Sequence, residues 1–414
     1  MKISIISDFH FGFGSGTERE NDPFESAEEA FEKALDSDII LIAGDIFDTR
    51  SPGTETLTKA MELFIKPLIT SSETRLVKGI NKNIEKVLPM GLSGIPMVAI
   101  HGTHERRVKG FLNPVEALER AGFIIYLHCN GAVFQKGEEK VCIQGMSGVP
   151  DQYSETVLKN WNPRPFPGCF NIFMLHQSVS PFLKVAPHTI DINKLPGGFN
   201  LYICGHIHKP EHSVYSNAPF LIPGSLVPTQ LTKEATQPVG FWQIETNPLK
   251  IDFIELENQR RFYYEELENP TTENIENKIK TILEKQHKKK PLIRINISGK
   301  TAAPLNEIKT KFENKAMIFF KKEPDKKEHS EKTKTLEEHK LSVQELGKKL
   351  LEKNLKELKL DPGTFENIFE LLLEKKHDEA LEFLKKNMEK EQKESSKKHR
   401  EETEGKEPGR FLGN

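Results

Sequence analysis

Five short clusters of acidic and histidine residues each follow directly on an apolar run of the sequence. They are Asp8-Phe9-His10, Gly44-Asp45, Gly102-Thr103-His104-Glu105, His176 and Gly205-His206-Ile207-His208. Carboxylate oxygens and imidazole nitrogens are ligands with which proteins hold divalent metal ions. A pair of such ions hydrolyses phosphoesters by activating water, neutralising phosphate charge and stabilising the leaving oxygen. The clusters therefore predict a two-metal phosphoesterase site.

The joint order of the clusters carries this prediction, because each residue alone has an ordinary explanation. A lone histidine after a strand is more often a hydrogen-bonded structural residue, and an aspartate beside glycine is usually part of a turn. Asp45 is the best candidate to bridge two metals, since Gly44 permits a close turn at the end of its strand. Asp8 and His10 lie two positions apart at a strand end, so both can turn toward one metal. His206 and His208 have the same spacing.

The apolar runs before the clusters have the length and β-branched composition of strands buried on both faces. They span residues 3–6, 39–43, 97–100, 172–175 and 201–204. Ligands gather beyond the carboxyl ends of strands in open α/β folds, so five separate segments can converge on one crevice. Between the first two runs, apolar residues at helical spacing from Phe24 to Leu35 predict a helix. The fold class is therefore expected to be α/β.

The composition changes near residue 258, where a second and smaller α/β domain is expected. Helical spacing covers Ile275 to Leu283 and Leu305 to Phe312, and strand-like runs cover 292–297 and 317–320. A charged linker follows over residues 326–338.

Residues 339–388 are expected to be helical and to be followed by a disordered, charged tail. Ser342 and Glu345 have capping-box spacing before apolar stripes, which either pack on each other or bind a partner. Within the tail, residues 389–414, the Phe411-Leu412 pair is either a docking peptide or simply a chain end.

Composition limits the function classes. The formal net charge is −2 and 29% of the 414 residues are charged, which argues against a globally basic protein that wraps nucleic acid. Contacts to DNA would have to come from local clusters of basic residues. The alternative is that these clusters are simply a solvated basic surface with no nucleic-acid partner. The candidates are Arg106, Arg107, Lys109, Arg260, Arg261 and Lys288-Lys289-Lys290. Dispersed cysteines, with no signal peptide and no apolar run of membrane-spanning length, indicate the cytoplasm and no membrane association.

The clusters resemble those of the calcineurin-like metallophosphoesterases. The sequence is further similar to the archaeal double-strand-break repair nucleases of the meiotic-recombination-eleven family, which are related to bacterial SbcD. The motifs that carry this similarity are Phe11-Gly12, Asp45-Ile46-Phe47-Asp48, His176-Gln177, Gly205-His206-Ile207-His208-Lys209-Pro210 and Pro223-Gly224-Ser225. The resemblance is most specific over residues 1–245. It implies a layered α/β sandwich nuclease domain over residues 1–257, a DNA-capping domain over 258–325 and an ATPase-binding helical segment over 339–388.

The resemblance also implies roles for the site residues. Asp8, His10 and His208 would bind one manganese ion, His176 and His206 the other, and Asp45 would bridge the two. His104 would not be a ligand but the catalytic residue, holding the scissile phosphate and stabilising or protonating the leaving sugar oxygen. Glu105 would either orient His104 through a hydrogen bond or be a glutamate of a surface turn. His101, His128 and His212 are expected to be structural.

Thr103 departs from the family pattern, in which asparagine usually supplies an amide oxygen to the second metal. A threonine hydroxyl is a weaker ligand on a shorter side chain, so it would ligate poorly, act through water or leave a coordination position open. The second ion is therefore expected to bind weakly in an enzyme that remains active.

The function that the resemblance implies is a manganese-dependent DNA exonuclease and endonuclease. Two manganese ions per subunit would act on DNA ends, in a homodimer that works with an SMC-like coiled-coil ATPase in double-strand-break repair. Two alternatives remain open. One is a small-molecule phosphodiesterase or phosphatase on the same fold, because the metal ligands do not define the leaving group. The other is a DNA-end scaffold that Thr103 has weakened as a catalyst.

Overall fold

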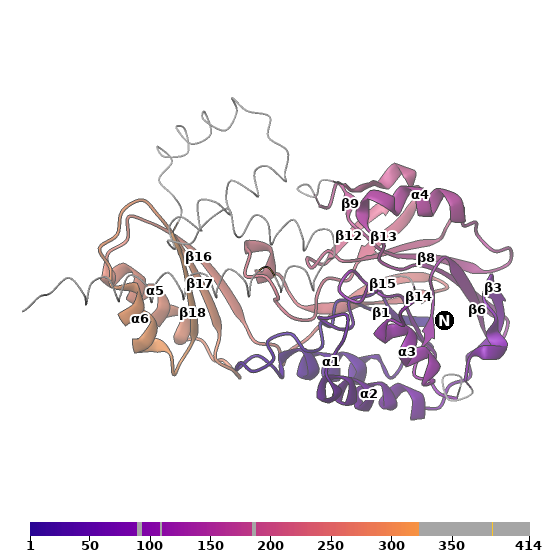
Figure 1. Cartoon of the computed structure of the whole chain (residues 1–414), viewed down its shortest axis with the longest axis horizontal. Coiled ribbons are helices and arrows are strands. Elements are labelled where there is room, and N and C mark those ends of the chain that lie inside the picture. The colour runs from indigo at the N-terminus through magenta and orange to yellow at the C-terminus, as the bar shows by residue number, and fades with distance from the viewer. Residues whose placement is uncertain (89–92, 108–109, 184–187, 323–382, 384–414) are drawn as a thin grey trace, which may run out of the picture. The chain divides into compact units, whose positions relative to one another are not determined.

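The computed structural model describes residues 1–88, 93–107, 110–183, 188–322 and 383. The described residues up to 322 belong to one compact unit, Met1–Pro324 (Figure 1). The predicted linker over 326–338, helical segment over 339–388 and tail over 389–414 lie outside the described residues, apart from residue 383. No helix among the described residues is long and apolar enough to span a membrane.

The first sheet has six strands in the order β15-β14-β1-β2-β4-β5. Its strands are β1 (Lys2–Ile6), β2 (Ile39–Ile42), β4 (Met97–Ala99), β5 (Ile125–Tyr126), β14 (Gly240–Thr246) and β15 (Leu249–Glu255). β1, β2, β4 and β5 run parallel, while β14 and β15 add an antiparallel edge. Three helices pack on its outer face: α1 (Asp22–Ala34), α2 (Thr54–Ile69) and α3 (Pro114–Arg120).

The second sheet has seven strands in the order β12-β13-β11-β8-β7-β6-β3. Its strands are β3 (Arg75–Ile80), β6 (Asn130–Lys136), β7 (Glu139–Met146), β8 (Phe170–His176), β11 (Leu201–Gly205), β12 (Glu211–Tyr215) and β13 (Ala218–Ile222). Its outer face packs against α4 (Asp151–Trp161), and β9 (Val179–Ser180) and β10 (Ile190–Asp191) form a separate small sheet.

An apolar layer joins the two large sheets face to face. Ile3, Ile5 and Leu41 of the first sheet lie in one buried cluster with Ile172 and Ile203 of the second. Alternate residues of the same strands, such as Ile40 and Ile42, face the helices instead. Each central strand is therefore buried on both faces, which explains its unbroken apolar composition. The predicted layered α/β sandwich is confirmed.

All five strands predicted before the clusters are present, but they lie in two sheets rather than one. β1, β2 and β4 belong to the first sheet and β8 and β11 to the second. The crevice expected at the end of one open sheet is therefore built across the ends of two facing sheets.

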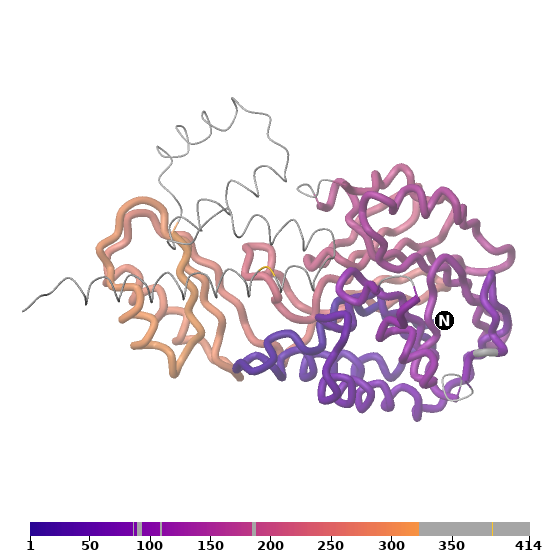
Figure 2. Tube along the Cα trace, viewed as in Figure 1, coloured from indigo at the N-terminus to yellow at the C-terminus, as the bar shows by residue number. Residues whose placement is uncertain are grey.

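A third sheet follows, with parallel strands β16 (Phe262–Glu268), β17 (Leu292–Ser298) and β18 (Met317–Lys322). Two helices, α5 (Thr272–Leu283) and α6 (Leu305–Phe312), bury their apolar stripes against it (Figure 2, orange), and Ile275, Ile308 and Ile295 belong to one buried cluster. A capping box between Thr271 and Asn274 begins α5. These elements match the expected small α/β region, while the domain boundaries at 257/258 and 325/326 remain predictions.

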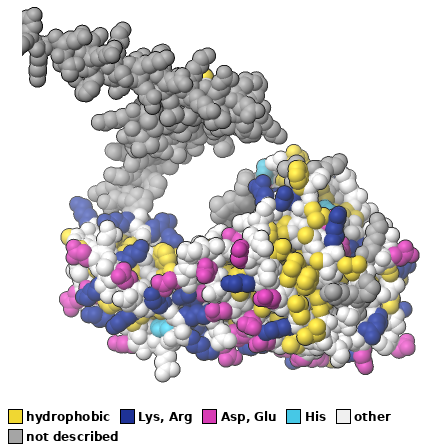
Figure 3. All heavy atoms as spheres, turned by 60° about the horizontal axis from the view of Figure 1, so that its bottom comes forward, with side chains coloured by type: hydrophobic (Ala, Val, Ile, Leu, Met, Phe, Trp, Pro, Cys, Tyr) yellow, Lys and Arg dark blue, Asp and Glu magenta, His cyan; other side chains and the backbone are white. Residues whose placement is uncertain are grey.

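Several basic residues considered for DNA contact are instead paired within the chain. Arg260 is buried, and its Nε and Nη2 donate to the carboxylate of Asp22 at 2.8 and 3.0 Å. Lys289 pairs with Glu25, and Lys290 with Glu18 at 3.0 Å. Elsewhere on the face shown in Figure 3, basic and acidic side chains are interspersed. Arg260 therefore fits neither alternative, because it is buried and its charge holds two segments of the chain together. The role of Arg261 and of Lys288-Lys289-Lys290 toward DNA stays a prediction.

Candidate metal centre

The polypeptide takes up an unusual backbone conformation where β1, β2 and β11 end. Asp8, His10, Asp45 and His206 have φ angles of 53°, 53°, 47° and 78°, in the left-handed region that non-glycine residues rarely adopt. The two loops after β1 and β2 support each other, because the Asp8 N–H donates to the Gly44 carbonyl and the His10 N–H to the Asp45 carbonyl, both at 3.0 Å. Clustering of such strained residues is typical of functional sites.

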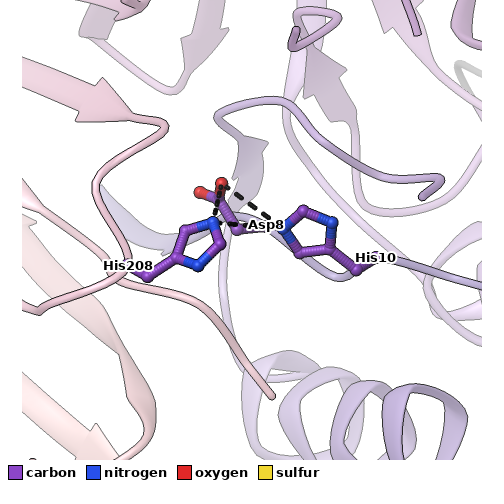
Figure 4. A group of neighbouring side chains, drawn as sticks. All are labelled: Asp8, His10 and His208. Atoms are coloured by element: carbon purple, nitrogen blue, oxygen red, sulfur yellow. Dashed lines mark hydrogen bonds and ion pairs between the residues drawn. The ribbon is translucent and has the colours of Figure 1, made fainter. Parts of the chain in front are cut away.

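The first group of candidate ligands is Asp8, His10 and His208 (Figure 4). The Nε2 atoms of His208 and His10 lie 3.5 and 3.9 Å from Oδ1 of Asp8, and 3.2 Å from each other. Asp8 and His10 are buried, whereas the His208 side chain is 29% exposed. The three inward-facing atoms can therefore surround one ion, open to solvent on the His208 side.

The second group is Asp45, His176 and His206. Nε2 of the buried His176 lies 3.2 Å from Oδ2 of Asp45, and the His176 and His206 ring centroids are 5.3 Å apart. A third grouping, His10, Asp45 and His104, overlaps the other two. All six residues predicted as ligands are thus brought together, and Asp45 belongs to two of the groups.

The histidine rings are held by their outer nitrogens, so that Nε2 faces the centre. Nδ1 of His10 lies 3.1 Å from Oδ1 of Asp48, Nδ1 of His208 lies 3.0 Å from the Thr229 hydroxyl, and Nδ1 of His176 donates to the Ala43 carbonyl at 2.7 Å. Such partners fix ring orientation in metal sites. Sequence reasoning assigned no role to Asp48 or Thr229. The motif Asp45-Ile46-Phe47-Asp48 could have indicated Asp48, because it places a second acidic residue close to a predicted ligand. No sequence pattern indicated Thr229.

The buried polar atoms of the centre fit a cation. Asp8 Oδ1 and His176 Nε2 are buried and have no hydrogen-bond partner among the described residues, although uncompensated buried carboxylates are costly. Burial alone would raise the pKa of Asp45, but the neighbouring His176 and His10 rings and the His104 backbone N–H together lower it. Burial and His176 together lower the pKa of His206 to about 4, so its ring is neutral at pH 7. Burial lowers the pKa of His176, but the Asp45 and Asp8 carboxylates outweigh it and raise that pKa to about 9, so this ring would give up a proton when a metal binds. Carboxylates and imidazoles form a donor set suited to divalent transition metals.

His104 lies at the open edge of this group. Its backbone N–H donates to Oδ1 of Asp45 at 3.0 Å, and its Nδ1 donates to the Asp48 carbonyl at 2.9 Å. The His104 side chain is 43% exposed, which is more than the side chains of Asp8, His10, Asp45, His176 and His208. Nε2 therefore remains for a substrate.

Glu105 has neither of the roles expected for it. The residue is fully buried rather than in a surface turn. Its Oε1 accepts the Phe47 N–H at 2.8 Å and its Oε2 accepts the Gly102 N–H at 2.7 Å, so both oxygens bind backbone rather than His104. Burial, and next to it the charge of Asp45, raises the pKa of Glu105 to about 8. Glu105 thus ties the His104 loop to the loop after β2.

The Glu105→Gln variant is expected to lower the free energy of unfolding by about 1–3 kcal/mol, because the new amide NH₂ faces one of the two backbone donors and leaves it unsatisfied. A folded-state pKa of about 8, against 4.5 as the ordinary value, means that the metal-free protein loses stability as pH rises from about 4.5 through 8. The variant should lack this pH dependence, because glutamine does not titrate. Urea unfolding of both proteins without metal at pH 6 and 9 measures the free energy of unfolding, with the exposed Glu155→Gln as control. Equal stabilities and equal pH slopes would contradict the assignment.

Thr103 stands beside the bridging candidate. Its Oγ1 lies 3.4 Å from Oδ2 of Asp45, a long hydrogen bond from a half-buried side chain. The hydroxyl is therefore near the second group of ligands, and its role toward a metal stays a prediction.

Two facing sheets with aspartate and histidine side chains gathered at their strand ends define a metal-dependent phosphoesterase fold with a candidate two-metal site. Residues 1–210 match the calcineurin-like phosphoesterase family, and the chain belongs to that family.

Among curated proteins, the chain is similar to double-strand break repair proteins. It is 25% identical over 302 residues to "Double-strand break repair protein MRE11" of Mus musculus, covering 64% of this chain and 42% of that protein. It is 25% identical over 291 residues to "DNA double-strand break repair protein Mre11" of Methanopyrus kandleri, covering 63% and 58%. For the MRE11 of Arabidopsis thaliana, identity is 24% over 363 residues, covering 72% and 50%. The chain thus spans about half the length of these relatives.

Proposed function

We propose that this protein is a manganese-dependent DNA nuclease that processes the ends of double-strand breaks. The observation that carries the proposal is the pair of ligand groups that share Asp45, with His104 at their open edge. The distant similarity to double-strand break repair proteins supports DNA as the substrate. Without that similarity, the centre would define phosphoester hydrolysis but not the leaving group.

In this proposal, Asp8, His10 and His208 hold one manganese ion, and His176 and His206 hold the other. Asp45, which belongs to a ligand group on each side, would contribute its carboxylate to both ions. The bound ions would supply the activated water and neutralise the charge of the phosphate. The Asp48, Thr229 and Ala43 contacts keep the imidazole rings in the orientation that binding requires.

His104 is the proposed catalytic residue. The Asp48 carbonyl accepts a hydrogen bond from the Nδ1–H and fixes the ring, so the opposite nitrogen can hold the scissile phosphate. When the ring is protonated, Nε2 gives its proton to the leaving sugar oxygen, which would otherwise depart as a poor alkoxide. The backbone bond to Asp45 places this ring next to the bridging carboxylate.

The domain scheme and partners belong to the same proposal. Residues 1–257 would form the nuclease domain, 258–325 a DNA-capping domain and 339–388 a segment that binds an SMC-like ATPase, with two chains forming a homodimer in the cytoplasm. The four free cysteines suit a reducing compartment. Deleting residues 339–388 should leave nuclease chemistry intact while abolishing co-purification with the ATPase.

Hydrolysis assays test the proposal. Full-length protein with manganese should cut end-labelled duplex or hairpin DNA, and chelation by EDTA should stop the reaction. Turnover of small phosphate esters without cleavage of DNA would contradict the nuclease assignment and favour the small-molecule phosphodiesterase.

The Thr103→Asn variant tests the alternative of a weakened scaffold, which the threonine beside Asp45 favours. An asparagine amide oxygen reaches further than the hydroxyl and is expected to raise the affinity for the second manganese ion by about 10–100-fold. Calorimetric titration measures this change, with the exposed Thr236→Asn as control. One ion and no activity in the native protein, against two ions and activity in the variant, would establish the scaffold. Unchanged affinity would exclude Thr103 from the metal site.

A further inference from the structure

A pocket opens beside the candidate metal centre. It has a volume of about 480 Å³, and its lining includes Arg50, Thr103, Arg106, Arg107 and Phe111. Thr103 connects the two sites, because it lines this pocket while its Oγ1 lies 3.4 Å from Oδ2 of Asp45. The described lining residues include no carboxylate, in contrast to the acidic centre next door.

The three arginines of this pocket are not neutralised by the described part of the chain. No ion pair among the described residues joins Arg50, Arg106 or Arg107 to a carboxylate, whereas Arg260 and Arg120 pair with Asp22 and Glu116. Arg107 is held in place by neutral groups, since its Nη1 donates to the Arg50 carbonyl at 3.0 Å and to the Ser51 hydroxyl at 2.9 Å. Convergent arginines without an acidic partner are suited to bind phosphate, whose oxygens accept bidentate hydrogen bonds.

An aromatic ring stands at the same pocket. The Phe111 side chain is 64% exposed, and the Arg107 guanidinium lies 5.6 Å from its ring centroid. A large exposed aromatic ring beside arginine is the arrangement on which unpaired bases of single strands stack. The pocket thus offers charge for a phosphate and a flat face for a base.

We propose that this pocket binds the nucleotide next to the scissile phosphodiester, its phosphate on the arginines and its unpaired base against Phe111. The inference rests on the proposed function and deepens it. An ester with a single phosphate occupies only the metal centre, so the substrate is a polynucleotide strand that is unpaired beside the bond to be cut.

The Arg106→Gln variant tests the pocket, because no hydrogen bond within the described residues depends on this side chain. For manganese-dependent hydrolysis, kcat/KM is expected to fall at least about tenfold more for a single-stranded oligonucleotide than for bis(p-nitrophenyl) phosphate. The matched control is Arg120→Gln, on an exposed arginine of α3 paired with Glu116, which should change neither substrate by more than about twofold. An equal loss on both substrates, or no loss on either, would overturn the proposal.

Binding without hydrolysis separates this inference from the nuclease assignment. Fluorescence anisotropy of a labelled single-stranded oligonucleotide in EDTA should show about tenfold weaker binding for Arg106→Gln and for Phe111→Ala than for the wild-type protein and Arg120→Gln. If the wild-type protein binds the strand in this pattern but never cuts it, the proposed function fails while the pocket stands. Binding that none of the variants weakens, or no binding by the wild-type protein, overturns the pocket.

Discussion

Replacing Asp45 with asparagine is expected to lower phosphodiester hydrolysis by roughly two to four orders of magnitude and to weaken manganese binding in parallel. Asp45 places one carboxylate oxygen 3.2 Å from His176 Nε2 and uses the other to accept the His104 backbone N–H at 3.0 Å. An amide can keep the second contact, but it removes the negative charge that two ligand groups share. Calorimetric manganese titration and initial rates on labelled DNA measure the two effects.

Asp252→Asn is the matched control for this change. The substitution removes the same charge, but from an exposed residue that pairs with Lys250 on the surface. That variant should bind manganese and hydrolyse DNA as the native protein does. An Asp45→Asn protein that still binds two ions with native affinity and retains its rate would exclude Asp45 as the bridging ligand.

Replacing His104 with glutamine is expected to lower kcat by about 10²–10⁴-fold while the affinity for manganese is kept. Glutamine can occupy a similar volume but cannot deliver a proton to the leaving oxygen. Its backbone retains the bond to Asp45, so the metal ligands should stay in place. Rates and calorimetric titration on the same preparation separate the two quantities.

The surface residue His212 provides the control, since His212→Gln should change neither rate nor affinity. The contradicting result is a parallel fall of rate and metal affinity in His104→Gln. His104 would then be a ligand, as its grouping with His10 and Asp45 permits geometrically.

Local sequence patterns predicted the elements of the fold but not their division between sheets. The run at residues 39–42 is apolar throughout, because Ile40 and Ile42 face helices while Ile39 and Leu41 face the second sheet. The apolar composition of such a strand is the same whether helices or another sheet cover its second face. The number of sheets therefore depends on pairings between distant strands, which residue periodicity does not encode.

The predicted ligands came together because each directly follows a buried strand, and the ends of such strands meet. Residue type was a poorer guide where the partners were distant. Glu105 looked like a turn residue, yet the backbone donors of Phe47 and Gly102 bury it. Arg260 looked available for phosphate, yet it pairs with Asp22, 238 positions away in the sequence. Charge is visible in a sequence, whereas the group that neutralises it is not.

A crystal structure of the full-length protein grown with manganese tests the central claim most directly. Anomalous scattering should show two ions, one ligated by Asp8, His10 and His208 and one by His176 and His206, with the carboxylate of Asp45 binding both and His104 binding neither. A single ion, or an ion held by His104 together with His10 and Asp45, would contradict the two-metal centre.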